Sequence, residues 1–221
     1  MVTLLQSLGL ESVPQHDPGD ALWLTDPNRR PERRMEAGGV HAGAHRIAGG
    51  SASLVEALVA ALPEGSVLTG SALIGLRDHG ESVELLRTGG PSLRARRVVL
   101  ALPPRLVQER VAFDPPLHEA VDQALQDTPT WMAAQAKAVV SFGTPFWREA
   151  GHSGNAFVRH PQAVLGEVFD QSSEPAGALG GFVALTAAQR EHFRVGLPLL
   201  IESQLTQLYG IDAQSGQLAL Q

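Results

Sequence analysis

Residues 131–143 read Trp131-Met-Ala-Ala-Gln-Ala-Lys-Ala-Val-Val-Ser-Phe-Gly143, and Thr144-Pro-Phe-Trp147 follows at once. The stretch is largely apolar, and its β-branched and aromatic residues favour a strand. We expect a long central strand over Trp131–Phe142. Its one charged side chain is Lys137, the only lysine among the chain's 17 lysine and arginine residues.

The choice of lysine at position 137 has two interpretations. Arginine is a planar fork that is always charged, whereas lysine is a compact point charge whose pKa falls when it is buried. A chain that otherwise uses arginine could therefore require an ammonium group here. Alternatively, the Lys137 stem packs on the sheet while its head reaches water.

Composition limits the classes of protein. A length of 221 residues fits one large domain or two small ones, and 43% hydrophobic residues are enough for a core. The net charge of −6 argues against nucleic acid as a partner. The basic pairs Arg29-Arg30 and Arg33-Arg34 are expected in an exposed loop. The sequence has no cysteine, which excludes disulfides and thiolate metal sites. We expect a cytoplasmic protein without a signal peptide or membrane span.

Outward from the central strand, periodicity and turn residues predict further elements. On the N-terminal side we expect a helix over 1–10 that ends at Gly9, a loop with at most brief structure over 14–45, a helix from the N-cap Ser51 to Leu62, and strands at 67–68, 73–76, 83–86 and 93–102. The 98–102 part of the last strand is expected to be buried. The other expected elements are helices at 104–109 and 118–125, strands at 111–113, 163–169 and 178–185, and helices at 186–194 and 198–209.

Four motifs then stand in order along the chain: Arg46-Ile-Ala-Gly-Gly-Ser-Ala-Ser-Leu54, Val98-Val-Leu-Ala-Leu-Pro-Pro104, Val111-Ala-Phe-Asp-Pro-Pro-Leu117 and Ala136-Lys-Ala-Val-Val-Ser-Phe-Gly-Thr-Pro-Phe-Trp147. Each motif alone is common, because glycine pairs often precede helices and proline pairs often follow strands. Together they resemble the flavin-containing amine oxidases, the monoamine and polyamine oxidase family. The resemblance runs from about residue 4 to about residue 210.

This resemblance implies an α+β fold in which a mixed β-sheet substrate domain with flanking helices adjoins part of a discontinuous, Rossmann-like FAD domain. We expect an N-terminal segment of the substrate domain over 1–45, partial FAD domain over 46–103, substrate domain over 104–210, and a tail over 211–221. The chain has no Gly-x-Gly-x-x-Gly motif in strand–turn–helix context, and the family's C-terminal FAD stretch is missing. We therefore expect an internal fragment that alone binds FAD weakly or not at all and is inactive.

The resemblance also implies roles for particular residues. Lys137 matches the family lysine that holds a water against flavin N5, so its ammonium is expected in a concavity. The positions that match cofactor-binding segments are Gly49, Gly50, Leu73, Ala101, Leu102 and Pro103. Phe146 and Trp147 match an aromatic pair that is expected to pack in the core. No metal site is expected, because His41 and His45 have helical ligand spacing but neither a helix-forming context nor a third ligand.

The predicted activity is that of an FAD-dependent amine oxidase-like oxidoreductase: a hydride passes from a C–H next to nitrogen to flavin N5, and O2 reoxidises the flavin. The expected partners are a small-molecule amine and O2, with no nucleic acid and no membrane. The amine itself and the oligomeric state stay open. Two alternatives also stay open: another flavin-superfamily oxidoreductase, such as a desaturase or a protoporphyrinogen-oxidase-like enzyme, and a non-catalytic truncated remnant or binding module.

Overall fold

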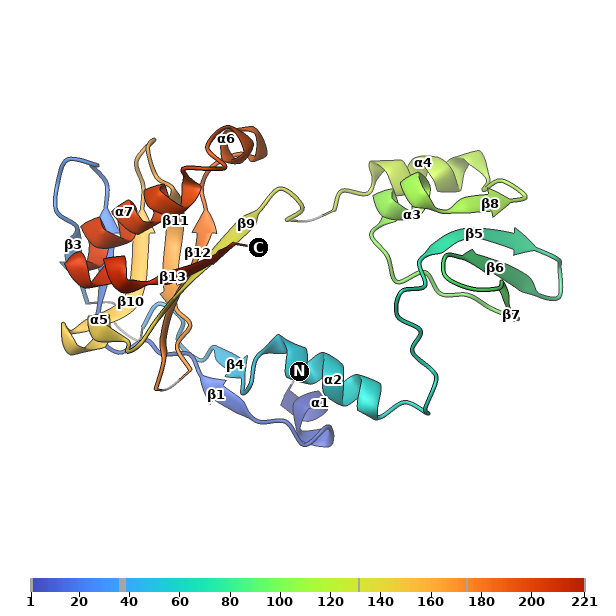
Figure 1. Ribbon diagram of the computed structural model, residues 1–221, viewed down its shortest axis with the longest axis horizontal. Helices are drawn as coiled ribbons and strands as arrows, with labels where there is room; N and C mark the ends of the chain where they lie inside the picture. Colours follow the sequence, from blue (N-terminus) through green and yellow to red (C-terminus); the bar gives the residue numbers. More distant parts are fainter. Residues whose placement is uncertain (1, 36–38, 131, 174, 221) are drawn as a thin grey trace. The chain divides into compact units, whose positions relative to one another are not determined.

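A computed structural model describes residues 2–35, 39–130, 132–173 and 175–220. The chain divides into two compact units (Figure 1). The first unit consists of residues 1–57 and 134–221, and the second consists of residues 58–133. The second unit is therefore an insertion in the sequence of the first.

The first unit has its elements on both sides of that insertion. They are α1 (Val2–Ser7), β1 (Ser12–Pro14), β2 (Asp20–Leu24), β3 (Glu32–Arg34), β4 (His45–Ile47), most of α2 (Ser51–Ala60), β9 (Ala136–Phe142), α5 (Phe146–Glu149), β10 (His152–Val158), β11 (Leu165–Asp170), β12 (Gly177–Val183), α6 (Ala187–His192), α7 (Leu197–Tyr209), the 3-10 helix η1 (Ile211–Ser215) and β13 (Gln217–Leu220).

Within the described residues, the first unit is built on a sheet of seven strands in the order β13-β9-β12-β11-β10-β2-β3, here called the large sheet. Strand β2 runs parallel to β10 and the other pairs are antiparallel, so the sheet is mixed, as predicted. Strand β9 has a neighbour on each side but is second from the edge, and it begins at Ala136. Trp131, the start of the expected central strand, lies outside the described residues.

Helix α7 covers one face of the large sheet (Figure 1). Its buried Leu197, Ile201, Leu205 and Leu208 recur at helical spacing and form one apolar stripe. They join a core cluster with the inward residues of the strands, which include Leu22, Leu24, Ala138, Val140, Phe142, Ala156, Leu165, Val168, Leu179 and Val183. The helix ends as predicted at Gly210, whose φ of 91° favours glycine.

The segment 14–45, expected to be a loop with at most brief structure, contains β2, which the sequence did not identify. Leu22 and Leu24 are fully buried in the core, and β2 pairs with both β10 and β3. The five-residue strand is flanked by Pro, Gly and Asp, which hid its alternation in the sequence. The basic cluster after it is exposed, as expected, but Arg33 and Arg34 lie in strand β3 rather than in a loop. Arg33 pairs with Asp20 and Arg34 with Glu32.

The second unit contains a small sheet in the order β7-β6-β5-β8 beside two helices. Its elements are β5 (Leu73–Asp78), β6 (Val83–Arg87), β7 (Leu93–Ala95), α3 (Pro104–Arg110), β8 (Ala112–Asp114) and α4 (Glu119–Asp127). The predicted turn at Asp78-His-Gly80 joins β5 to β6, and the Asp78 carboxylate accepts a hydrogen bond from the Gly80 N–H. Residues 67–68 form no strand.

The strand predicted over Leu93–Leu102 ends at Ala95. The apolar run expected to be buried, Val98–Leu102, is not a strand, and Val99 is 90% exposed. No described strand pairs with this run, so its apolar side chains have no sheet to cover them. An apolar sequence alone does not supply the neighbouring strand that a buried strand requires.

The compact units differ from the domain boundaries expected at 45/46 and 103/104, because contacts place residues 46–57 with the large sheet and residues 104–133 with the small one. In the expected tail, Ile211–Ser215 forms η1 and Gln217–Leu220 forms β13, which pairs with β9. The assignment of 46–103 to an FAD domain and of 104–210 to a substrate domain stays a prediction. Within the described residues, no helix combines the length and apolarity needed to cross a membrane.

Gly154 on β10 provides a test of the packing. Its φ is +84°, and a Cβ there would lie 2.8 Å from both Asp170 Cβ and Trp147 Nε1. We expect Gly154→Ala to lower the free energy of unfolding by at least about 2 kcal/mol, from backbone strain and overpacking together. Urea unfolding measures the loss. Gly143→Ala is the matched control, because a Cβ at Gly143 meets nothing within 4 Å. Equal stabilities of the two variants would contradict this packing.

Candidate functional site

A two-glycine turn connects β4 to α2. Gly49 and Gly50 have φ of +80° and +88°, in the left-handed region that favours glycine. The Gly50 N–H donates to the Ile47 carbonyl, which closes the turn. A Cβ at Gly50 would meet nothing within 4 Å, so the space beside this backbone is open. The turn therefore presents bare main chain at the start of a helix.

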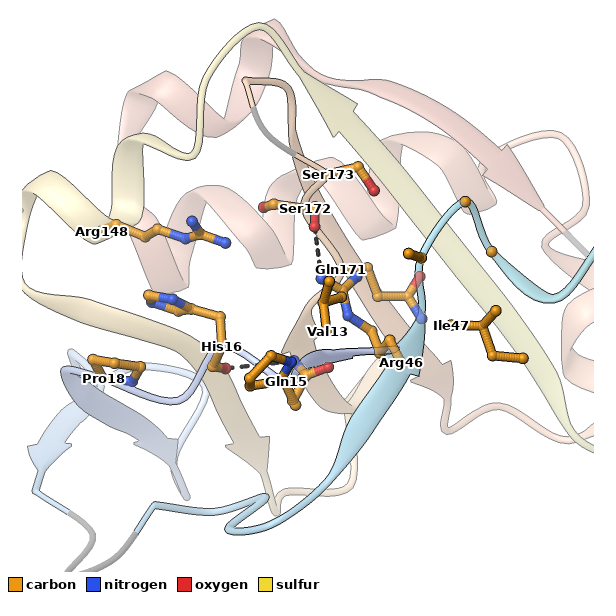
Figure 2. A pocket seen from close by; sticks show the side chains of 14 residues that line it. Val13, Gln15, His16, Pro18, Arg46, Ile47, Arg148, Gln171, Ser172 and Ser173 are labelled. Atoms are coloured by element: carbon orange, nitrogen blue, oxygen red, sulfur yellow. Dashed lines mark hydrogen bonds between the residues drawn. The ribbon is translucent and has the colours of Figure 1, made fainter. Parts of the chain in front are cut away.

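This turn lines a pocket of about 770 Å³ in the first unit. Figure 2 shows the side chains around it. The lining residues are Val13, Pro14, Gln15, His16, Pro18, Arg46, Ile47, Ala48, Gly49, Gly50, Arg148, Gln171, Ser172 and Ser173. Among these described residues there are two guanidinium groups and no carboxylate. The pocket is therefore suited to a group rich in hydrogen-bond acceptors.

Arg46 has spare donor capacity at this pocket. Its Nη2 donates to the Ser172 carbonyl at 2.7 Å, which fixes the guanidinium against the β11–β12 connection (Figure 2). Its Nε is buried and has no hydrogen-bond acceptor among the described residues. A buried donor without an acceptor costs free energy, so this N–H is suited to an acceptor supplied by a ligand.

The buried carboxylate of Asp170 binds two of the residues that line the pocket, Arg148 and Ser172. It accepts hydrogen bonds from Trp147 Nε1 at 2.8 Å, from Arg148 Nε and Nη2 at 2.8 and 3.0 Å, and from the Ser172 N–H at 2.8 Å. Burial acts to raise the pKa of Asp170, but the hydrogen bonds from Arg148, Ser172 and Trp147 outweigh it and lower the pKa below its ordinary value. The expected packing of Trp147 is thus confirmed: its side chain is fully buried and Phe146 packs beside it.

Lys137 is exposed, not buried as its apolar strand suggested. Alternation along β9 explains this: Ala138, Val140 and Phe142 point into the core, so Lys137 points to the opposite face. Its Nζ lies 5.0 Å from the centroid of the Phe182 ring, a cation–π contact. It makes no ion pair with any described residue.

Lys137 belongs to a row of side chains that crosses the large sheet on this open face. The pairing registers place Lys137 opposite Phe182, Phe182 opposite Glu167, Glu167 opposite Phe157, and Phe157 opposite Trp23. We call these five residues the Lys137 row. Because strands lie about 4.8 Å apart, Glu167 is about 10 Å of sheet away from Lys137.

Two arginines add to the Lys137 row. The Trp23 and Phe157 rings stack with centroids 4.6 Å apart. Arg34 lies over the Trp23 ring at 4.7 Å, and Arg159 lies over the Phe157 ring at 5.4 Å. The Arg159 Nη2 also pairs with Glu167 Oε1 at 2.9 Å. The row thus combines aromatic surface with charges that are paired everywhere except at Lys137.

The remaining expected cofactor residues lie in the second unit. Leu73 begins β5, Ala101 and Leu102 are exposed, and Pro103 precedes α3 as its N-cap. The structure therefore brings Leu73 and the 101–103 segment into one unit, while Gly49, Gly50 and Lys137 lie in the other.

The two histidines with metal-ligand spacing make different contacts. The His41 ring packs edge-on against Phe169, and His45 Nδ1 shares a hydrogen bond with the Ser12 hydroxyl at 3.3 Å. Within the described ranges, no group of three or more His, Cys, Asp or Glu residues is placed to hold a metal ion.

Solved structures share this fold. The structure of wild-type putrescine oxidase bound to putrescine is similar, with a TM-score of 0.79 at 18% sequence identity. The match covers 99% of this chain and 70% of the putrescine oxidase chain. Cyclohexylamine oxidase from Brevibacterium oxydans IH-35A is also similar, with a TM-score of 0.77 at 17% sequence identity. This match covers 100% of this chain and 70% of the cyclohexylamine oxidase chain. The fold is that of the amine oxidases.

Sequence comparison assigns the family. The model for flavin containing amine oxidoreductases matches residues 20–191, which is most of the chain, so the chain belongs to that family. The family's cofactor is FAD. Putrescine oxidase of Kocuria rosea is 34% identical over 152 residues, 63% of this chain and 30% of that enzyme. The chain thus spans about a third of the curated relatives it matches.

The residues present in the first unit fit part of such a cofactor. The bare main chain at Gly50 leaves open space, and the buried Arg46 Nε offers a donor without an acceptor among the described residues. A flavin ring carries carbonyl oxygens and ring nitrogens that accept hydrogen bonds. The donor-rich, carboxylate-free lining of the pocket suits that chemistry.

Sequence reasoning missed most of the pocket and the far half of the Lys137 row. Strand β10 was not predicted, because Gly154 and the polar Ser153 and Asn155 interrupt its pattern. The alternation Glu167-Val168-Phe169 was the one available signal for the open face. Gln15, His16 and Arg148 reach the pocket through tertiary packing, for which no local pattern exists.

The Asp170 network generates a second prediction. We expect Asp170→Asn to lower the free energy of unfolding by about 3 kcal/mol, because the buried donors of Trp147, Arg148 and Ser172 lose the charged acceptor that they share. The control Glu191→Gln removes an ion pair whose side chains are 76% and 78% exposed, and is expected to cost under about 1 kcal/mol. Chemical denaturation at neutral pH compares the two variants.

The same carboxylate predicts a pH dependence. Because the folded-state pKa of Asp170 is lowered, its contribution to stability is complete above the ordinary value of 3.8 and is lost as pH falls through the folded pKa. The wild-type chain should therefore lose stability on acidification more steeply than Asp170→Asn. Parallel slopes of unfolding free energy against pH for the two proteins would refute this role.

Proposed function

We propose that the protein is an FAD-dependent oxidoreductase that oxidises small-molecule amines at the C–N bond and uses O2 to reoxidise the flavin. The observation that carries the proposal is Lys137, an ammonium group unpaired among the described residues, at one end of an aromatic row on the open face of the large sheet. Family membership supports the use of flavin, and the names of the relatives support an amine as the substrate. Those names favour amine oxidation over desaturation.

We propose the following division of labour. The large sheet is the core of the substrate domain, and residues 46–103 belong to a discontinuous FAD domain. In the first unit, Gly49 and Gly50 would bind FAD by allowing its close approach to main chain. In the second unit, the segments proposed to bind FAD contain Leu73, Ala101, Leu102 and Pro103. The bound FAD supplies the electron acceptor for the substrate C–H and the donor for O2.

The chain's own residues supply binding and orientation. The aromatic rings of the Lys137 row offer apolar surface for the hydrocarbon part of the amine. The Lys137 ammonium would donate a hydrogen bond to a water and fix it next to the flavin, and its charge would favour negative charge that develops there. The open face positions this group because β9 directs alternate residues away from the core.

The proposed function is tested on the protein expressed from its full reading frame. We expect a flavin absorption spectrum, loss of that absorption on anaerobic addition of an amine, and O2 consumption in air. A protein that carries stoichiometric flavin, yet is reduced by no primary, secondary or polyamine, would exclude amine oxidation.

Lys137→Met tests the role of the ammonium in that protein. We expect flavin reoxidation by O2 to slow by at least about tenfold, a loss of ~1.4 kcal/mol of transition-state stabilisation. Folding should be preserved, because substitutions of exposed side chains change stability little. Lys137→Arg should also be slow, since its broad fork does not replace a point donor. Stopped-flow mixing of the reduced protein with O2 gives the rates.

Ser141→Ala is the control for this experiment. Ser141 is exposed on the same face of β9 and carries no charge, so its substitution should leave reoxidation unchanged. If Lys137→Met retains normal flavin content and normal reactivity with O2, the ammonium has no part in that step.

A further inference from the structure

The far end of the Lys137 row contains a site of the kind that binds cations, and the chain fills it with its own arginine. An aromatic face, a carboxylate and main-chain carbonyls together attract an ammonium or guanidinium group. Here those groups are the Phe157 ring, the Glu167 carboxylate and the Gly166 carbonyl. Each of them contacts the Arg159 guanidinium.

The position of Arg159 is fixed from several directions. Its Nη1 donates to the Gly166 carbonyl at 2.8 Å, and its Nη2 donates to Glu167 Oε1 at 2.9 Å. Its main-chain N–H donates to the Leu24 carbonyl at 2.8 Å, which anchors the residue at the end of β10. Both the main chain and the guanidinium group of Arg159 are therefore fixed by hydrogen bonds.

This arrangement has a consequence for the charge of the substrate. A diamine that lies along the Lys137 row with its reacting nitrogen at the Lys137 end would bring its second ammonium toward Glu167. The Arg159 guanidinium already neutralises that carboxylate and would repel a second cation. An amine with an uncharged remote end carries no second cation toward Arg159 and therefore avoids this repulsion.

We propose that Arg159 is a specificity-determining residue that selects amines with an uncharged remote end and rejects diamines. The inference rests on the proposed function, because it assumes that the amine lies on the open face of the large sheet. The Lys137 row contains a carboxylate, Glu167, that could bind the second ammonium of a diamine. In this chain the Arg159 guanidinium already pairs with that carboxylate.

The test compares pentylamine with 1,5-diaminopentane on the protein expressed from its full reading frame. The wild-type protein should have a higher kcat/KM for pentylamine. Arg159→Gln frees the Glu167 carboxylate, and we expect the ratio of kcat/KM for the diamine to that for the monoamine to rise by about fivefold or more. In Arg159→Gln/Glu167→Gln the gain should vanish, since no free carboxylate remains.

Arg33→Gln is the matched control. Arg33 also pairs with a carboxylate at 2.9 Å and donates to a carbonyl, but its partners are Asp20 and Ala150, outside the Lys137 row. Its substitution should leave the ratio unchanged. Thermal unfolding of each variant verifies folding. Should Arg159→Gln not fold, Arg159→Lys keeps the charge, loses the fork, and is expected to keep the wild-type preference.

Calorimetric binding of the two amines provides a readout that does not depend on turnover. A shift in relative affinity on Arg159→Gln without any oxidation would support the role of Arg159 and contradict the proposed activity. Oxidation of both amines with the same ratio in wild type and Arg159→Gln would overturn the role of Arg159 and leave the proposed activity intact. A wild-type preference for the diamine would also overturn it.

Discussion

The first unit depends on one fully buried carboxylate. Asp170 receives hydrogen bonds from the Trp147 indole, the Arg148 guanidinium and the Ser172 main chain, and its own carbonyl accepts from Gln15 at 2.6 Å. A buried charge is tolerated only when such partners surround it. These contacts join α5, β11 and the segment after β1. Because Arg148, Gln15 and Ser172 also line the pocket, the interaction that stabilises the fold also shapes the site.

The two faces of the large sheet have opposite chemistry. On one face, aliphatic side chains from its inner strands pack under α7 into a continuous core. On the other face, five of its strands present aromatic rings and charged side chains. A mixed sheet that is buried on one side only leaves the second face available for a ligand, and strict alternation keeps the two functions from interfering.

Sequence patterns predicted what local physics determines. Helix α7 followed from its apolar stripe and the glycine after it, and β9, β11 and β12 followed from their apolar residues, whereas β13 lies in the segment expected to be a tail. Strand β2 was hidden because five residues between turn-forming neighbours carry little periodicity, and β10 was hidden because Gly154 and two polar residues break its pattern. Lys137 was identified by its singularity, but its exposure is set by the register of β9 against β12. Arg159 and Glu167 are unremarkable in sequence, since their pairing and their place in the row arise only when β10 and β11 lie side by side.

The division of the first unit into residues 1–57 and 134–221 has a consequence for synthesis on the ribosome. Leu22 on β2 pairs with Ala156 on β10, so its partner is translated only after the whole second unit. At typical elongation rates the delay is on the order of ten seconds. During that time the apolar β2 has emerged without the strand beside which it is buried, while the inserted unit has already been translated. Strand β3 follows β2 closely and is available as one neighbour, but the β10 side of this hydrophobic strand stays open until the sheet closes, and this interval is when we expect chaperones to engage the nascent chain.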